Sequence, residues 1–357
     1  MKKYKIIIIV LGVLLVLIFA VGFYYNYQLS RMTSKSEEVV VTISGGSIAS
    51  IGKTLEQNKL IRSNFIFKLY TKLNKKNNLK AGTYKFNRNM NMKKIVDSLE
   101  KGSSYNPDQI SITFQEGLNI RKIAKVVEEN TNNKYDDFME LMNDKEYIKS
   151  LISEYWFLTD DILNEKIYYP LEGYLFPDTY YLQSKDVTNK EIVKTMLDEM
   201  NDKLEPYKKD IESSEYTIHE IMTLASIVEM EGKTSNDRAS IAGVMVNRVN
   251  DKWSLGMDST TYYYLKRDDY KVGLTYNELN TCDNAYNTRC RSFIGLPVGP
   301  ITNAGMESLK ATIKYHKHDY YYFVSDCSGE NYFTKTATEH YNIIEKLKRE
   351  GKWSCYQ

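Results

Sequence analysis

The sequence predicts a mixed α+β protein with three parts: an N-terminal transmembrane helix, a small subdomain and a larger domain. Residues 6–25 contain no charged side chain, and twenty such residues are long enough to cross a bilayer as one helix. Residues 39–102 and 110–350 each mix short β-branched runs with stretches of helical periodicity. A chain of 357 residues can hold two or three domains, and it contains enough apolar residues to form a core.

The apolar segment is expected to remain in the membrane as an anchor. Lysines among residues 1–5 mark its cytoplasmic end, and tyrosines at its other end suit the opposite membrane interface. A cleaved signal peptide is the alternative, because Ala20 and Gly22 are small, but signal peptides have apolar regions of about 7–15 residues. The sequence therefore predicts a cytoplasmic N-terminus, a single span over residues 6–25, a polar linker over residues 26–38 and an extracytoplasmic remainder.

The small subdomain, residues 39–102, is predicted to run strand, helix, helix, strand. A β-branched run begins it, Ser63 is placed to cap the second helix, and Lys80 to Phe86 predicts the closing strand. A further helix follows, with Asn91 as its N-cap and Gly102 at its end. This βααβ order is that of a LysM-like module, a small glycan-binding fold. A generic α+β adaptor is an equally good interpretation.

The larger domain, residues 110–350, begins with a strand at residues 110–114, followed by a helix. Thr188 and Glu191 form a capping box ahead of another helix. Most of the motifs that carry chemistry fall within residues 216–350, which are therefore expected to form the core of this domain.

Composition and motif spacing exclude several classes of function. The net charge is only +2 and no basic run is interleaved with aromatic residues, so no nucleic-acid partner is expected. The four histidines form no HExxH pattern and the four cysteines form no CxxC pair. Neither a metal site nor any other cofactor is therefore predicted.

Glu229 is the candidate catalytic residue. It ends an apolar helix in which Ala225 and Ser226 lie one turn before it on the same face, where small side chains would leave room for a ligand. Glu231 lies about 200° further round the helix, so only one of the two acids can face a given cleft. Apolar neighbours and the negative end of the helix dipole should raise the pKa of Glu229, as general acid catalysis of glycoside cleavage requires. The alternative is a surface glutamate that ends a core helix.

Several segments of the chain, taken in their order, resemble the motifs of one protein family. They are F-Q-E-G-L, L-E-G-Y-L-F-P-D-T-Y, L-A-S-I-V-E-M-E, D-R-A-S-I-A-G-V-M-V-N-R, L-G-M-D-S-T-T-Y-Y-Y, Y-N-T, G-L-P-V-G-P-I-T-N-A-G, Y-Y-F-V-S-D and F-T-K-T-A-T-E-H. In this order they resemble the endolytic murein transglycosylases, also called YceG-like proteins. The resemblance covers roughly residues 38 to 348, and the N-terminal anchor agrees with it.

The resemblance implies an enzyme of the bacterial cell membrane that cuts nascent peptidoglycan strands internally. It would cleave the MurNAc–GlcNAc bond, form 1,6-anhydro-MurNAc ends and so terminate strand elongation. The expected partners are the glycan strands, the membrane, and penicillin-binding proteins with other wall-synthesis proteins. The catalytic acid of the A-S-I-V-E motif falls on Glu229, and one acid suffices because the muramic acid C6 hydroxyl, instead of water, attacks C1.

The resemblance also implies substrate-binding roles for residues in two further motifs. The D-P-T and Y-N-T motifs of the family place these roles on five residues: Asp258, Thr260, Tyr286, Asn287 and Thr288. Ser259 stands where the family usually has proline, and an Arg-Cys-Arg run follows Y-N-T where the family usually has an aromatic or small polar residue. The Arg-Cys-Arg run leaves the local loop conformation open.

Cys282 and Cys290 flank the Y-N-T loop and are predicted to form a disulfide that clamps it. An even number of cysteines in an extracytoplasmic domain permits disulfides, and Cys327 with Cys355 is left as a second pair. The alternative is four free thiols.

Two other functions remain open at the level of sequence. The first is a non-catalytic peptidoglycan-binding scaffold of the wall-synthesis machinery, which the anchor and the small subdomain would also suit. The second is a lysozyme-type hydrolase, which would need a second carboxylate about 5–9 Å from Glu229. Analysis of the ends of digested glycan separates the three.

Overall fold

The computed structural model of the chain describes residues 2–43, 47–103 and 105–353, with side chains from residue 10 onward. The chain divides into two compact units, residues 1–108 and residues 109–357. Both contain helices and short antiparallel strand pairs, so the fold is mixed α+β as the sequence predicts.

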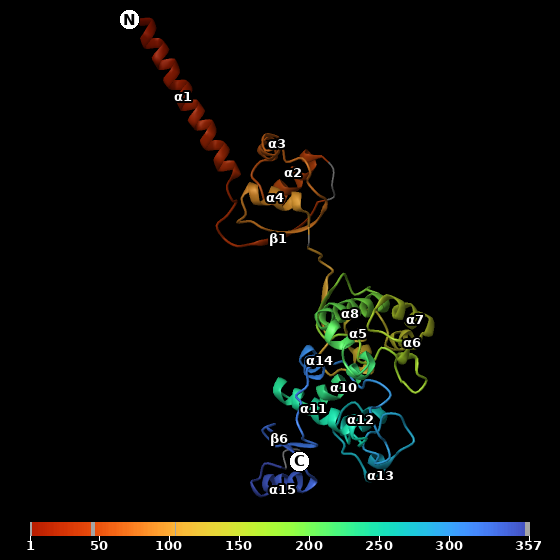
Figure 1. Cartoon of the computed structure of the whole chain (residues 1–357). Coiled ribbons are helices and arrows are strands. Elements are labelled where there is room, and N and C mark those ends of the chain that lie inside the picture. Colours follow the sequence, from red (N-terminus) through yellow and green to blue (C-terminus); the bar gives the residue numbers. More distant parts are fainter. Residues whose placement is uncertain (1, 44–46, 104, 354–357) are drawn as a thin grey trace. The chain divides into compact units, whose positions relative to one another are not determined.

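The N-terminal helix α1 (Lys2–Leu29) is one continuous helix (Figure 1). Its segment Val10–Leu29 has a mean hydropathy of 2.0, and by length and composition this segment is able to cross a membrane. The helix extends four residues beyond the predicted span, so the first part of the predicted linker is helical. Leu29 packs on the core of the first unit, and the Arg62 guanidinium donates hydrogen bonds to the carbonyl oxygens of Ser30 (2.7 Å) and Arg31 (2.8 Å).

The rest of the first unit follows the predicted strand, helix, helix, strand order. It consists of β1 (Glu38–Ile43), α2 (Ile48–Gln57), α3 (Asn64–Leu73), β2 (Gly82–Asn87) and α4 (Met92–Lys101). The two strands pair antiparallel from Glu38 opposite Asn87 to Ile43 opposite Gly82, and their inward side chains join one apolar core with the helices. Ser63 caps α3 and Asn91 caps α4, both as predicted.

The first half of the second unit is a helical layer around one strand pair. Its elements are β3 (Ile110–Thr113), α5 (Ile120–Asn130), α6 (Tyr135–Asn143), α7 (Lys145–Glu154), a 3-10 turn (Asp160–Leu163), β4 (Thr179–Leu182), α8 (Asn189–Leu204), a second 3-10 turn (Glu205–Tyr207) and α9 (Lys208–Glu212). Strand β3 pairs antiparallel with β4, although 65 residues separate them. Fully buried aromatic rings, among them Phe138, Phe157 and Tyr174, fill the core behind this pair.

The second half of this unit contains α10 (Ile218–Glu231), α11 (Ser235–Asn250), α12 (Asp258–Tyr264), α13 (Tyr276–Asn280), α14 (Met306–Ile313), β5 (Tyr322–Ser325), β6 (Asn331–Thr334) and α15 (Ala337–Arg349). Helix α10 packs against both α11 and α14 (Figure 1). Its residues belong to both apolar cores of the unit, so α10 joins the two halves.

Candidate functional site

Helix α10 is fixed at both ends by local sequence. Thr217 and Glu220 form a capping box at its start, and every residue from Ile221 to Val228 is buried. The helix ends at Glu231, and Gly232 is its C-cap residue. Gly232 has a φ of −100°, and a Cβ there would lie 2.5 Å from Arg238 Cγ, so glycine is needed for close approach to α11.

The carboxylate of Glu229 is held where three elements meet. Its Oε1 lies 3.1 Å from Nη2 of Arg238 near the start of α11. Its Oε2 accepts a hydrogen bond of 3.0 Å from the backbone N–H of Gly305, the N-cap residue of α14. Only 6% of the side chain is exposed, so the open groove expected around Glu229 is not present in this structure.

The small residues before Glu229 do not make room for a ligand. Ala225 and Ser226 are fully buried, and the segment at residues 301–302 packs directly over them. The hydroxyl of Ser226 accepts a hydrogen bond of 3.0 Å from the N–H of Ile301, and the hydroxyl of Thr302 donates to the carbonyl of Ser226. The sequence expectation was wrong here, because small side chains also permit a second backbone to come close.

Glu116 is a second carboxyl group beside Glu229. It lies in the loop after β3, where Gly117 adopts a φ of +77° and donates its N–H to the carbonyl of Asn303 (2.9 Å). A Cβ added at Gly117 would lie 3.8 Å from Glu229 Cγ, and a Cβ added at Gly305 would overlap Glu116 Oε1. Partial desolvation and the negative charge of Glu229 raise the pKa of Glu116.

Glu231 faces a different part of the molecule, as the helix geometry predicts. Its Oε1 accepts a hydrogen bond of 2.8 Å from the hydroxyl of Ser259 on α12. It lines a cavity of about 510 Å³ whose wall also includes Asp258, Arg289 and Trp353. Burial raises the pKa of Glu231 above its usual range. Glu229 and Glu231 therefore do not share one cleft.

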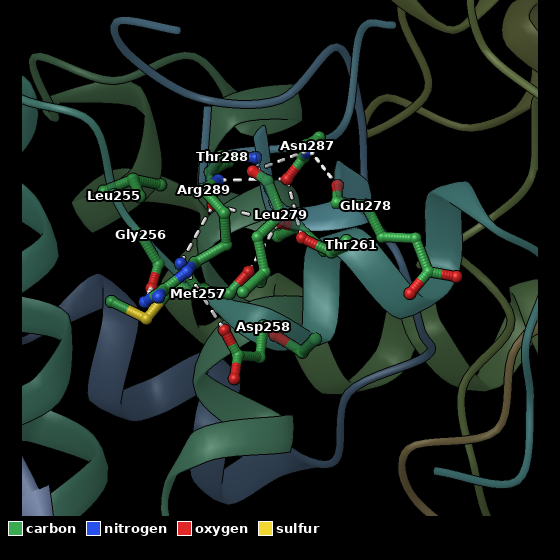
Figure 2. Close-up of polar contacts among 12 residues, drawn as sticks. Leu255, Gly256, Met257, Asp258, Thr261, Glu278, Leu279, Asn287, Thr288 and Arg289 are labelled. Carbon is green, nitrogen blue, oxygen red and sulfur yellow. Dashed lines mark hydrogen bonds and ion pairs between the residues drawn. The ribbon is translucent and has the colours of Figure 1, made fainter. Parts of the chain in front are cut away.

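Asp258 begins α12 and is the exposed member of the five residues predicted to bind substrate. Its side chain is 60% exposed and pairs with Arg289, with 3.2 Å between Oδ1 and Nε. In Figure 2 the guanidinium group of Arg289 lies between Gly256 and Asp258, and it also donates a 3.1 Å hydrogen bond to the carbonyl of Gly256.

The other four predicted substrate residues, Thr260, Tyr286, Asn287 and Thr288, are fully buried. The amide nitrogen of Asn287 donates to the carbonyls of Glu278 (2.9 Å), Leu279 (3.3 Å) and Thr281 (2.7 Å), and its oxygen accepts from Thr261 and from the N–H of Arg289 (Figure 2). The hydroxyls of Thr260 and Thr288 lie 2.9 Å apart. In this structure the four side chains organise the loop from inside, and none presents a surface to a sugar.

The structure joins Cys282 and Cys290 in a disulfide, with 5.4 Å between their Cα atoms. The bridge closes the loop that contains Tyr286 to Thr288. The second pair considered from sequence involves Cys355, which lies outside the described residues. No group of three or more His, Cys, Asp or Glu side chains able to hold a metal ion occurs among the residues that the structure describes.

Glu172 is a buried acid of the L-E-G-Y-L-F-P-D-T-Y segment to which the sequence analysis assigned no role. Its carboxyl group accepts hydrogen bonds from the N–H of Ile120 (3.1 Å), the hydroxyl of Tyr263 (3.0 Å) and the amide of Asn303 (3.2 Å). Burial outweighs these donors and raises the pKa of Glu172 to about 8. The group links three segments of the second unit from inside and has no access to substrate.

The fold is that of a two-unit α+β protein in which two carboxyl groups, those of Glu116 and Glu229, lie near each other at one end of α10. The chain belongs to the YceG-like family, which matches residues 40–346. It is 34% identical over 334 residues to the endolytic murein transglycosylase of Bacillus subtilis, covering 92% of this chain and 91% of that protein.

Two further comparisons agree. The endolytic murein transglycosylase of Streptococcus pneumoniae strain D39 is 29% identical over 94% of this chain, which spans 64% of that longer protein. A crystal structure of a yceG-like protein from Listeria monocytogenes matches with a TM-score of 0.61 and 34% identity. That match covers 87% of this chain and the whole of the Listeria chain.

Proposed function

We propose that this chain is a membrane-anchored endolytic murein transglycosylase that cleaves the MurNAc–GlcNAc bond of peptidoglycan glycan strands. The observation that carries the proposal is the position of Glu229. Its resemblance to the family's acidic motif supports a catalytic role for this residue, and its carboxylate lies where α10, α11 and α14 meet. Relatives that bear this activity in their names align over more than nine-tenths of the chain.

The reaction needs one proton donor that later becomes a proton acceptor. Glu229 gives its proton to the glycosidic oxygen, so that this oxygen leaves C1 as the 4-hydroxyl of GlcNAc. The C6 hydroxyl of the same MurNAc forms the new bond to C1, and its proton returns to Glu229. The product end is 1,6-anhydro-MurNAc, no water is consumed, and the enzyme finishes in its starting protonation state.

The anchor would keep this chemistry close to the membrane, where new strands are made. In this proposal helix α1 crosses the membrane once, with the N-terminus in the cytoplasm and the chain after residue 29 outside. The βααβ order of the first unit supports a LysM-like, glycan-binding role for it. Strand cutting at this location would terminate elongation and place the enzyme beside penicillin-binding proteins.

A lysozyme-type hydrolase is the second candidate, and Glu116 is the observation that favours it. A Cβ on Gly305 would overlap Glu116 Oε1 while the N–H of Gly305 binds Glu229 Oε2, so bond lengths limit the separation of these two oxygens to roughly 7 Å or less. Paired carboxylates at about 5–9 Å are typical of hydrolysing glycosidases.

The products decide between the two candidates. The full-length protein in detergent is incubated with uncrosslinked glycan strands, and the ends of the fragments are identified by mass spectrometry. Anhydro-MurNAc ends at internal cuts are the expected result. Reducing ends that take up oxygen from labelled water would establish the hydrolase instead, and intact strands would leave only a binding scaffold.

A further inference from the structure

We propose that the exposed face of α3 binds anionic lipid headgroups on the outer surface of the membrane, and that this contact holds the first compact unit against the bilayer. The inference rests on the membrane anchor of the proposed function and on none of its chemistry. The exposed face has two components. They are an apolar row, formed by Phe65, Leu69 and Leu73, and two lysines beside it, Lys68 and Lys72.

The apolar row runs along the whole of α3. Phe65, Leu69 and Leu73 follow one another at intervals of four residues, so they lie on one side of the helix. The other side carries Phe67 and Tyr70, which belong to the core of the first unit. Phe65 is 68% exposed and Leu73 is 65% exposed. Single exposed apolar side chains are common, but a row of them on one short helix is typical of a surface that another apolar phase covers.

The lysines give this surface its charge. Lys68 and Lys72 are exposed and lie one turn apart beside the apolar row, and Lys75 follows just after the helix. Among the residues that the structure describes, no carboxylate pairs with these three lysines, whereas Lys76 pairs with Glu100 at 2.6 Å. A lysine stem lies along apolar surface while its ammonium group reaches lipid phosphates. Anionic headgroups therefore match both components of the face.

The place of α3 in the first unit favours lipid as the occupant. Helix α3 packs against the end of α1 (Figure 1), and Arg62, two residues before α3, binds the carbonyl oxygens of Ser30 (2.7 Å) and Arg31 (2.8 Å). Residue 30 directly follows the apolar segment Val10–Leu29. Helix α3 has ten residues and is about 15 Å long, so all of it stays near the membrane surface when α1 spans the bilayer.

The attachment of α3 to α1 is also rigid. The guanidinium group of Arg62 lies 4.6 Å from the centre of the Tyr27 ring, and Leu29 packs on the core of the first unit. The exposed face is thereby held beside the headgroups at a high local lipid concentration, and little further freedom is lost when it binds. A soluble protein partner has no such advantage.

Hydrogen–deuterium exchange of the full-length protein in nanodiscs, with one copy in each disc, tests the inference. One set of discs contains phosphatidylcholine alone, and the other contains phosphatidylcholine mixed with phosphatidylglycerol. Amides of residues 64–76 should exchange about tenfold more slowly in the anionic discs, because lipid binding stabilises α3 against local opening. High salt should remove most of this difference. Amides of β1 and β2 should exchange alike in both discs and report that the unit is folded.

Two double variants separate the charge from the apolar row. Lys68→Gln/Lys72→Gln should remove the difference between the two kinds of disc, because charge is what distinguishes these lipids. Phe65→Gln/Leu73→Gln should lose the roughly tenfold protection in anionic discs, because the lysines alone bind the headgroups only weakly. All four positions lie outside the core, and the wild-type comparison carries the test if a variant does not fold.

Lys93→Gln/Lys94→Gln is the matched control. It removes the same charge from two exposed positions of α4, another ten-residue helix of the same unit, and should keep the difference between the discs. Loss of the difference in this control as well would overturn the inference, because the effect would then follow from net charge and not from the face of α3.

Equal exchange of residues 64–76 in both kinds of disc also overturns the inference, and so does a difference that survives in Lys68→Gln/Lys72→Gln. Slow exchange that appears only with two copies in one disc would assign the face to a second copy of the chain instead. In each of these cases the proposed function stands, because glycan cleavage is measured separately. A full-length protein that does not enter detergent-free discs would overturn both this inference and the membrane anchor.

Discussion

Glu229 and Glu231 are two residues apart in one helix, yet their surroundings differ in kind. Glu229 is bound by a guanidinium group and a backbone N–H, whereas Glu231 meets a hydroxyl at the edge of a separate cavity. Helix geometry alone predicts that they face different ways. Their neighbouring carboxyl groups also differ, because Glu229 lies beside Glu116 whereas Glu231 shares its cavity with Asp258.

Glu229→Gln should abolish glycan cleavage, with a loss of roughly a thousandfold, because glutamine keeps the size of the side chain but cannot donate a proton. Glu231→Gln is the matched control on the same helix and should keep most of the activity. Both are measured as the rate of appearance of new glycan ends, with thermal unfolding as a check of folding. A reversed pattern would move the catalytic role to the cavity that contains Glu231.

The raised pKa of Glu172 leads to a prediction about stability and not about activity. Its folded-state pKa of about 8 lies above the ordinary value of 4.5, so between these values the folded protein keeps a proton that the unfolded chain releases. The free energy of unfolding should therefore fall as pH rises from about 4.5 to 8, by up to about 1.4 kcal/mol per pH unit, and level off above that range.

Denaturant unfolding of Glu172→Gln at pH 5, 6, 7 and 8 tests this point. The variant should lose the fall in stability that Glu172 causes. Glu146→Gln is the control, since that side chain is 89% exposed and should leave the slope unchanged. An identical slope in wild type and Glu172→Gln would show that Glu172 is ionised in the folded protein across this range.

At the scale of elements, the sequence predicts what depends on local pattern. The order β1, α2, α3, β2 and the caps at Ser63 and Asn91 all follow from residues close together in the chain. The packing of residues 301–302 over Ser226 and the approach of Glu116 to Gly305 do not. These contacts join segments about 75 and 190 positions apart, and no repeating pattern in the sequence predicts them.

The same limit explains the Y-N-T loop. Polar side chains in a motif are expected either to bind a ligand or to form hydrogen bonds with the backbone. The sequence alone does not decide between the two roles. In the structure Asn287 binds three carbonyl groups of the preceding segment. The family motif therefore marks a loop that is built around this side chain, with Asp258 as its exposed neighbour.

Asn287→Ala should lower the free energy of unfolding by about 3 kcal/mol, because several buried polar groups would lose their partner. Asp258→Asn, at an exposed position, should change stability by less than about 0.5 kcal/mol. Chemical denaturation of both variants makes the comparison. An Asn287→Ala protein that is as stable as the wild type but has a raised KM would instead give this side chain the sugar-binding role first predicted for it.

At the scale of the whole molecule, helix α1 and the rest of the first compact unit are coupled more closely than a free linker would allow. The carbonyls of Ser30 and Arg31 are both bound by Arg62, and Tyr27 lies against the same guanidinium group at 4.6 Å from its ring centroid. Further along, the N–H of Glu37 is bound by Asn87 at the edge of the first strand pair. The exposed stretch between these two attachments is only a few residues long.

These contacts make the expected cut site of an external protease more specific. Trypsin added to intact spheroplasts should release a soluble fragment that begins at Ser36, because Lys35 is exposed whereas the carbonyl of Arg31 is held. N-terminal sequencing of the fragment gives the cut site, and Lys35→Gln should slow its release without changing the amount of protein in the membrane. A protein that trypsin cuts only after the spheroplasts are lysed would have its compact units in the cytoplasm. Release without any protease would mean that the apolar segment is a cleaved signal peptide and that α1 does not anchor the mature enzyme.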